Sequence, residues 1–254
     1  REKTQRVEVD EIYQKILKGG FPELYSNKNV EPKDFFETYI RTYIERDIRE
    51  LINVKDEIKF LKFVESIAAR TGQELNINDI SNSVEINNMT AQNWLSILVN
   101  TGLVYLLQPY YNNNVSRIVK RPKIYFMDTG LACFLAGYMD SQTLEKSAYN
   151  GAIFETYVVT EIIKSFANQG LDSRKYLYYY RDNNGKEIDL LILYNNVMYP
   201  IEIKKSYNPG KQAIKNFDVV KKLGLKTGNG GVVCLNKEIF PLDKENNLIP
   251  IELL

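Results

Sequence analysis

Hydrophobic residues recur at helical spacing in the first part of the chain. The apolar and polar positions of residues 7–18 fit a short helix, which ends at Gly19-Gly20 with Phe21-Pro22 behind it. Glycine just past a helix and proline after it are a normal helix end. Residues 33–52 place apolar side chains three and four positions apart with charges between them. This spacing predicts an amphipathic helix whose apolar stripe belongs to a core.

The stretch from residue 55 to residue 126 has a different pattern. The predicted elements are helices at 58–71, 78–81 and 88–100, a strand at 103–107, and returning strands at 118–120 and 123–127. Three helices followed by a β-hairpin is the element order of a winged helix-turn-helix.

The last hundred residues alternate between strand and helix patterns. The predicted elements are a helix at 151–168, strands at 176–181, 187–194 and 197–204, a helix at 211–222, and strands at 231–236 and 247–254. This alternation is typical of an α/β unit. We therefore expect an α+β protein with a helical linker at 1–54, a winged helix-turn-helix at 55–139 and an α/β domain with a mixed sheet at 140–254.

Composition narrows the chemistry that the chain can perform. Its 254 residues include no histidine and only two cysteines, Cys133 and Cys234. The absence of imidazole excludes a Ser-His-Asp triad and histidine metal ligands, and two cysteines are too few for a thiolate zinc site. Any catalysis must therefore use carboxylates, lysine, hydroxyl groups or a hard metal ion bound by oxygen.

Charge and hydropathy indicate no strongly charged or membrane-spanning character. The formal net charge is +1, so an attraction to nucleic acid or lipid has to be local. No run approaches the roughly 18 apolar residues of a membrane span, and the low cysteine use is typical of a reducing compartment. We therefore expect a cytoplasmic protein without a membrane segment. Because the chain begins at Arg1 rather than Met, we expect it to be part of a longer protein.

Two strand-like runs flank Asn195-Asn196, which is a strong turn signal. With these two residues as the loop, the register places Asp189 opposite Glu202. The same register places Glu187 opposite Lys204 on that face of the hairpin. Opposed Cβ atoms lie about 4.5–5.5 Å apart, a separation at which two ionised carboxylates repel each other. A Mg²⁺ ion bound by both carboxylates removes this repulsion, so the pairing predicts a cation site.

A third acid could join this pair. Glu155 lies on the apolar face of the predicted helix at 151–168, where an acid is costly unless it is paired or bound to metal. A purely structural alternative stays open. In that alternative Asp189 caps the turn, while Glu187 and Glu202 form surface ion pairs with neighbouring lysines, worth about 0–1 kcal/mol each.

This set of residues resembles the core of the PD-(D/E)XK nucleases. That core joins a helix acid, a strand Asp and a Glu-x-Lys triplet, which here are Glu155, Asp189 and Glu202-Ile203-Lys204. The residue before Asp189 is Ile188 rather than proline, which the superfamily tolerates. The resemblance implies an α/β nuclease-like domain in which Glu155, Asp189 and Glu202 bind Mg²⁺ or Mn²⁺. It also implies that Asp189, Glu202 and Lys204 are catalytic, with Lys204 orienting a water or offsetting charge on the phosphate.

The expected winged helix carries residues that suit DNA unevenly. Its third helix, 88–100, has no lysine or arginine, so the candidates for base contacts are the amide side chains of Asn87, Asn88, Gln92 and above all Asn93. The hairpin is basic, and its candidate phosphate contacts are Arg117, Lys120, Arg121 and Lys123. This pattern predicts DNA binding that is sensitive to salt and tolerant of sequence. The alternative is a charged wing used for protein contact or for self-association into a homo-oligomer.

Short motifs along nearly the whole chain resemble the C-terminal region of a prokaryotic AAA-type ATPase family. They are GGFPEL (19–24), TYIERDI (42–48), TGLVYLL (101–107), RPKIYFMDTGL (121–131), EIDLLI (187–192) and IEIKKS (201–206). In that family a domain of unknown function with winged-helix and nuclease-like parts follows the ATPase module. The sequence lacks the G-x-x-x-x-G-K-[ST] loop, so we expect an ATPase module upstream and no ATP site in these residues.

Three functions follow from these patterns. The first is a DNA phosphodiesterase dependent on Mg²⁺ or Mn²⁺, in the DNA-interacting region of an AAA-type ATPase. The second is a non-catalytic DNA- or protein-binding module that couples the ATPase to a partner. The third is a regulatory role resembling toxin–antitoxin systems, in which the wing mediates self-association. Whether the nuclease-like site cleaves DNA is left open by the sequence.

Overall fold

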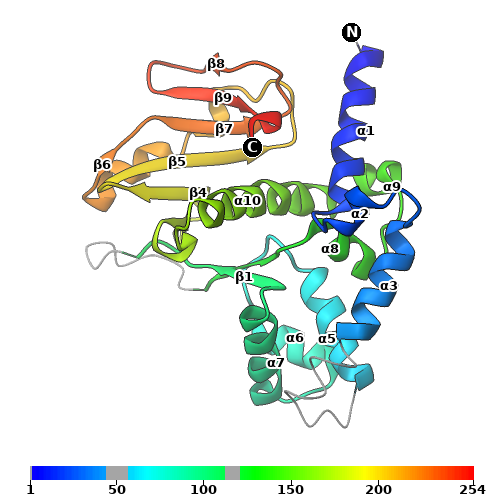
Figure 1. Cartoon of the computed structure of the whole chain (residues 1–254). Coiled ribbons are helices and arrows are strands. Elements are labelled where there is room, and N and C mark those ends of the chain that lie inside the picture. Colours follow the sequence, from blue (N-terminus) through cyan, green and yellow to red (C-terminus); the bar gives the residue numbers. More distant parts are fainter. Residues whose placement is uncertain (1, 44–56, 112–120) are drawn as a thin grey trace. The chain divides into compact units, whose positions relative to one another are not determined.

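The computed structural model describes residues 2–43, 57–111 and 121–254 (Figure 1). These residues form two compact units. The helical unit comprises Arg1–Tyr105 and Ile124–Tyr157, and the sheet unit comprises Leu106–Lys123 and Val158–Leu254. Helices together with a mixed sheet agree with the α+β class expected from the sequence. The finer division, with boundaries near residues 54 and 139, stays a prediction.

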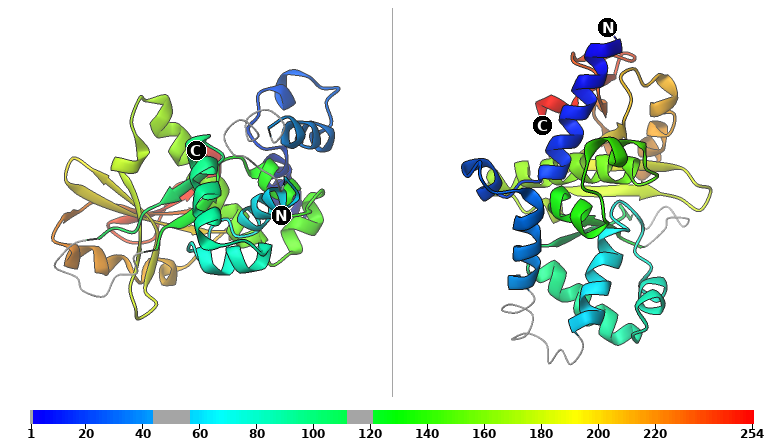
Figure 2. Two further views of the ribbon diagram at one scale, coloured as in Figure 1. Left: turned by 90° about the horizontal axis from the view of Figure 1, so that it is seen from below. Right: turned by 90° about the vertical axis from the view of Figure 1, so that its right-hand side faces the viewer.

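The helical unit is built from short and medium-length helices, which the two views of Figure 2 show in blue to green. They are α1 (Glu2–Lys18), α2 (Glu23–Ser26), α3 (Pro32–Thr42), α5 (Glu57–Ala68), α6 (Ile77–Val84), α7 (Asn88–Asn100), α8 (Thr129–Leu135), α9 (Ser141–Lys146) and the start of α10 (Asn150–Asn168). Helix α8 contacts α1, α3 and α5. A central position for α8 fits its composition, since its first five residues are all buried.

Apolar stripes of the helices form the core of this unit. Phe60 and Phe63 of α5 are fully buried and meet Trp94 of α7, with ring centroids 5.3 Å and 5.5 Å apart. On α3, Phe36 and Ile40 are also buried. Such edge-to-face aromatic contacts add to the stability gained by burying apolar area. The stripe predicted for residues 33–52 is therefore confirmed as core on α3, and residues 44–56 lie outside the described part of the chain.

The predicted end of the first helix is confirmed and has a specific cause. Helix α1 ends at Lys18, and Gly19 follows with a φ of +70°, a conformation that glycine adopts without strain. The backbone N–H of Gly20 donates to the Asp128 carboxylate at 2.6 Å, and the same carboxylate caps α8 by accepting from Leu131 N at 2.8 Å. A Cβ on Gly19 would collide with Asp128, so this glycine is also required for the close approach.

The element order predicted for residues 55–126 is present as far as the structure describes it. Helices α5, α6 and α7 are followed by β1 (Val104–Leu107) and β2 (Lys123–Phe126), which pair as a two-stranded sheet. Asn76 and Asn87 cap α6 and α7 by accepting from backbone N–H groups. The strand predicted at 118–120 falls outside the described residues.

The sheet unit is organised around a mixed sheet, coloured from yellow-green to red in Figure 1. Its strands, among the residues described, are β3 (Leu177–Arg181), β4 (Glu187–Tyr194), β5 (Val197–Lys204), β6 (Lys226–Thr227), β7 (Gly230–Cys234), β8 (Phe240–Pro241) and β9 (Asn246–Pro250). The order is β3-β4-β5-β7-β9-β8, with β6 pairing with β5. Strands β3, β4 and β5 are antiparallel, whereas β5, β7 and β9 are parallel.

The segment between β5 and β7 differs from its prediction. The sequence predicted one α-helix at 211–222, but the chain forms two 3-10 helices, η3 (Lys211–Ile214) and η4 (Phe217–Leu223). The buried side chains of η4 include Phe217, Val220 and Leu223, which recur every three residues. That spacing matches the three residues per turn of a 3-10 helix and explains why the α-helical interpretation was wrong.

The C-terminal strand is also shorter than predicted. It was expected to run from 247 to 254, but β9 ends at Pro250, and Ile251–Leu253 form a 3-10 turn. Proline has no backbone N–H to continue the ladder. Among the residues that the structure describes, no helix has the length and apolar character needed to cross a bilayer.

Candidate functional site

The β4–β5 hairpin has the register that the sequence predicted. Tyr194 pairs with Val197 across the turn, and the pairing continues as far as Leu190 opposite Ile201. Both turn residues have positive φ, 51° at Asn195 and 59° at Asn196. This is the conformation of a tight two-residue hairpin turn, in which asparagine is favoured. The hairpin therefore directs Asp189 and Glu202 to the same end of the sheet.

An irregularity in β4 determines where Asp189 lies. Tyr178 of β3 pairs with Leu191, but Tyr180 pairs with Ile188, so the register shifts by one residue between them. Asp189 and its neighbour in β4 thus lie opposite the single residue Tyr179. Such a β-bulge re-aims a side chain relative to a regular strand.

The bulge explains why one prediction about the hairpin is wrong. Glu187 was expected to face Lys204, on the assumption that Glu187 and Asp189 share a face. Instead, the Glu187 carboxylate lies 2.6 Å from Lys123 Nζ and 3.2 Å from Arg181 Nη1. An extra residue in a strand reverses the facing of every side chain beyond it. The expected pairing of Glu187 with Lys204 therefore does not form.

Three predicted residues come together at the end of the hairpin. Lys204 Nζ donates to Glu202 Oε1 at 2.7 Å and lies 3.4 Å from Asp189 Oδ2. Asp189 Oδ2 also accepts a hydrogen bond from Ile203 N at 2.8 Å. Asp189 and Glu202 are both buried, whereas the side chain of Lys204 is 41% exposed. The arrangement is two buried carboxylates with one ammonium group reaching solvent.

The neighbouring charges and the burial of this cluster shift the pKa values of Glu202 and Lys204. Burial, and then the neighbouring charge of Asp189, raise the pKa of Glu202 to about 8. The pKa of Lys204 is raised because the two carboxylates outweigh the effect of its own burial. Glu202 Oε2 is buried and has no hydrogen-bond partner among the described residues. A buried carboxylate oxygen without a partner is destabilising, and a bound cation would satisfy it.

A cavity of about 500 Å³ opens beside Glu202 and Lys204. The rest of its lining comes from the loop after β5 and from η3 and its C-terminal flank: Ser206, Pro209, Gly210, Gln212, Ala213, Lys215 and Asn216. The sequence did not single out Ser206 or Lys215 as site residues. Ser206 could have been found by its position just after the Glu-x-Lys triplet, whereas Lys215 follows η3 and carries no such signal. The cavity gives a ligand access to Glu202 and Lys204.

Glu155 was predicted as a third metal ligand. It lies on the part of α10 that belongs to the helical unit, and its Oε1 accepts a hydrogen bond from Tyr125 Oη at 2.6 Å. Within the described residues, no three aspartate, glutamate, cysteine or histidine side chains are grouped so that they could hold a metal ion. Its role as a metal ligand stays a prediction.

The predicted DNA contacts have different outcomes. Arg117 and Lys120 lie outside the described residues, and Arg121 is exposed. Lys123 is only 3% exposed and forms the ion pair with Glu187, so its prediction as a phosphate contact is wrong. The sequence pattern could not reveal this, because its partner lies 64 positions away. Asn93 is exposed on α7, which leaves its predicted base contact as a prediction.

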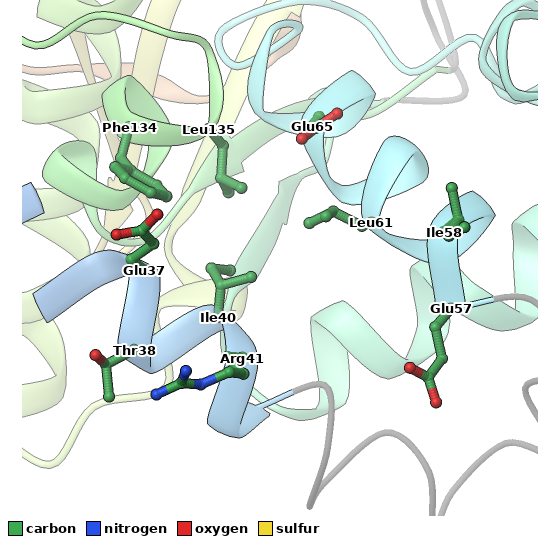
Figure 3. A pocket seen from close by; sticks show the side chains of 10 residues that line it. All are labelled: Glu37, Thr38, Ile40, Arg41, Glu57, Ile58, Leu61, Glu65, Phe134 and Leu135. Carbon is green, nitrogen blue, oxygen red and sulfur yellow. The ribbon is translucent and has the colours of Figure 1, made fainter. Parts of the chain in front are cut away.

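The helical unit contains a larger cavity of about 680 Å³ between α3, α5 and α8, shown in Figure 3. Apolar side chains such as Ile40, Leu61 and Phe134 line it together with the acids Glu37 and Glu65. Burial raises the pKa of Glu65. Glu37 projects from α3 and Glu65 from α5, on separate helices in Figure 3, so this cavity lacks the close charge cluster found around Glu202.

Both parts of the chain match family models whose function is not assigned. Residues 9–142 match the family described as Domain of unknown function (DUF8612), and residues 150–254 match Domain of unknown function (DUF4143). Uncharacterized proteins of Mycobacterium tuberculosis and Mycobacterium bovis are each 28% identical over 194 residues, which are 76% of this chain and 43% of theirs. The chain thus spans less than half the length of these relatives. The DUF8612 match covers more than half of the chain, and the chain therefore belongs to that family.

Proposed function

We propose that Asp189, Glu202 and Lys204 form the site of a DNA phosphodiesterase that depends on Mg²⁺ or Mn²⁺. The observation that carries this proposal is the buried, unpartnered oxygen of Glu202 beside a second carboxylate and an exposed ammonium group. An ion pair that served only stability would not be expected to leave a buried carboxylate oxygen without a hydrogen-bond partner. The open cavity beside it gives a phosphate access. Resemblance to the PD-(D/E)XK core supports the same assignment.

The donor set fits a hard divalent cation. Mg²⁺ is commonly held by one or two carboxylates together with waters and substrate phosphate oxygens. Asp189 and Glu202 supply such a pair, so the proposal does not require Glu155. A bound cation would supply an activated water and would stabilise charge on the phosphate. The high pKa of Glu202 is also expected at a site whose second positive charge is bound from solution.

The chain's own residues have separable roles in this proposal. Asp189 is held in place by the Ile203 N–H and offers its carboxylate from the bulge. Lys204, which reaches solvent, would orient the water or neutralise the phosphate as a point charge. Lys215, an exposed lysine that also lines the cavity, would contact the neighbouring phosphate.

The wider assignment is a DNA-interacting region of a cytoplasmic AAA-type ATPase. Three helices followed by a two-stranded sheet support the winged-helix interpretation. The motifs that resemble the ATPase family support the linkage, and the greater length of the relatives leaves room for such a module. Arg121 and Asn93 are exposed and would contact DNA in this assignment.

The test is nicking of supercoiled plasmid with Mg²⁺, with Mn²⁺ and with EDTA. Asp189→Asn, Glu202→Gln and Lys204→Met should each lower the cleavage rate by about 100-fold or more. Glu238→Gln is the matched control, because Glu238 is an exposed acid of the sheet unit outside the cavity. Equal cleavage by all four variants and the wild type would indicate a contaminating nuclease and contradict the proposal.

A second candidate is a non-catalytic DNA- or protein-binding module that couples an ATPase to a partner. Two observations favour it: Lys204 already offsets part of the acidic charge, and no three-ligand metal group occurs among the described residues. DNA binding by the wild type without any metal-dependent nicking would support this candidate.

A further inference from the structure

The described residues on both sides of the segment between β1 and β2 are bonded to the residue that lies opposite the β4 bulge. Tyr110 N donates to Tyr179 O at 2.7 Å, and Tyr179 N donates to Gln108 O at 3.1 Å. The Tyr179 hydroxyl donates to the carbonyl of Arg121 on the other side of that segment. Tyr179 is fully buried. These bonds fix the strand that faces Asp189.

The start of β4 is fixed by a separate set of contacts. Lys123 Nζ lies 2.6 Å from the Glu187 carboxylate and 5.5 Å from the centroid of the Tyr179 ring. Arg181 contacts the same carboxylate at 3.2 Å. Asn216 Nδ2 donates to the Glu187 carbonyl at 2.9 Å. Glu187 is thus held through both its side chain and its backbone, two residues before Asp189.

We propose that the Lys123–Glu187 ion pair is a positioning device for Asp189. A bulge has no regular ladder of its own, so its shape depends on how the strand is held at either side. Beyond the bulge β4 is held by its ladder with β5, which begins at Leu190. Before the bulge it is held by the pairing of Ile188 and Glu187 with β3 and by the contacts of Glu187, of which the Lys123 ion pair is the shortest. The pair therefore aims the Asp189 carboxylate at Ile203 N and Lys204.

The chemistry of the pair suits this role. Taking a lysine out of water is costly, and an ion pair with a buried lysine adds little net stability over apolar residues of similar size; here Lys123 is buried and the Glu187 side chain is 28% exposed. In some proteins such a pair instead specifies one arrangement of the elements that carry it, which is the role proposed here. The consequence of this inference for catalysis rests on the proposed function. The predicted effect of the ion pair on the position of Asp189 can be tested without it.

The test measures the position of Asp189 directly, without metal or DNA. The Ile203 amide, which donates to Asp189 Oδ2, should exchange with solvent about five- to tenfold faster in Lys123→Met than in the wild type. The Gly228 amide, which donates to Met198 O at 2.9 Å, should keep its rate. Lys221→Met is the matched control, since Lys221 forms an exposed pair with Asp218. Unchanged exchange at Ile203, or equal acceleration at Gly228, would overturn the proposal.

Glu187→Gln provides a second variant if Lys123→Met does not fold. It removes the charge from the other side of the pair, and the same two amides decide the outcome. In the nicking assay, a positioning role predicts that kcat falls while the KM for DNA stays constant. A wild-type chain that cleaves nothing would contradict the proposed function, and the Ile203 amide would still decide the positioning role.

Discussion

At the scale of single residues, the ionised carboxylate of Glu202 is destabilised by its surroundings. Its carboxylate is buried next to Asp189, and only one of its oxygens receives a hydrogen bond among the described residues. Other charged side chains that lie inside the sheet unit, such as Lys123, have close partners of opposite sign. A residue that stays under-satisfied in this way is a candidate for binding something from solution.

The raised pKa of Glu202 predicts how stability depends on pH. The folded pKa of about 8 lies above the ordinary value of 4.5, so the fold favours the protonated acid. Without divalent cation, the free energy of unfolding should therefore fall as pH rises through this interval and level off above it. Urea unfolding at several pH values measures this slope.

Glu202→Gln should remove that part of the pH dependence, and Glu238→Gln should keep it. Because a cation competes with the proton, added Mg²⁺ should stabilise the wild type more at about pH 8 than at about pH 6. A Glu202→Gln chain with the wild-type pH slope would show that Glu202 titrates normally.

At the scale of elements, the hairpin was predictable and the bulge was not. Asn195-Asn196 encodes a two-residue turn locally, and the register of β4 and β5 follows from the turn alone. The bulge lies in the pairing of β4 with β3 around Tyr179, and the neighbouring Glu187 contacts Lys123, which is distant in sequence. Likewise, the sequence does not separate η4 from an α-helix, because apolar positions three residues apart fit an α-helical stripe as well. The sequence therefore predicts the strands and their turn, but not which side of the sheet each acid faces, which depends on contacts between distant residues.

The cap residue Asn87 is expected to matter for stability, and Asn93 of α7 is expected to matter for DNA binding. Asn87 caps the helix by accepting from Thr90 N at 2.8 Å, so Asn87→Ala should lower the free energy of unfolding by about 1 kcal/mol. Asn93 is exposed, so Asn93→Ala should change stability by less than about 0.5 kcal/mol. Denaturant unfolding measures both.

The same two variants test the DNA assignment. Asn93→Ala should weaken DNA binding if α7 reads bases, whereas Asn87→Ala should do so only through lost stability. Wild-type DNA affinity in Asn93→Ala would remove that residue from the proposed interface.

At the scale of the whole molecule, a near-neutral net charge means that any DNA binding has to come from a local basic surface. The formal net charge is +1, and the relatives that match this chain are more than twice as long as the part they share with it. In the proposed function, DNA is therefore held by few phosphate contacts, with further contacts supplied by the rest of the protein.

The salt dependence of DNA binding distinguishes Arg121 from Lys123. The logarithm of DNA affinity should fall linearly with the logarithm of salt concentration, and Arg121→Ala should make that slope shallower by about one. Lys123→Met should leave the slope unchanged, because Lys123 is buried and paired with Glu187. Fluorescence anisotropy with a labelled duplex measures both slopes. A shallower slope in Lys123→Met would contradict the assignment of this lysine to the interior.

The central claim is that Asp189 and Glu202 together hold a divalent cation. Anomalous scattering from crystals of this chain soaked in Mn²⁺ tests it most directly, because Mn²⁺ binds at carboxylate sites that accept Mg²⁺. We expect a peak within coordination distance of one oxygen of each carboxylate, with Glu202 Oε2 among them, and no such peak in Glu202→Gln. Saturating Mn²⁺ with no peak between the two carboxylates, and with Lys204 still bridging them, would contradict the claim.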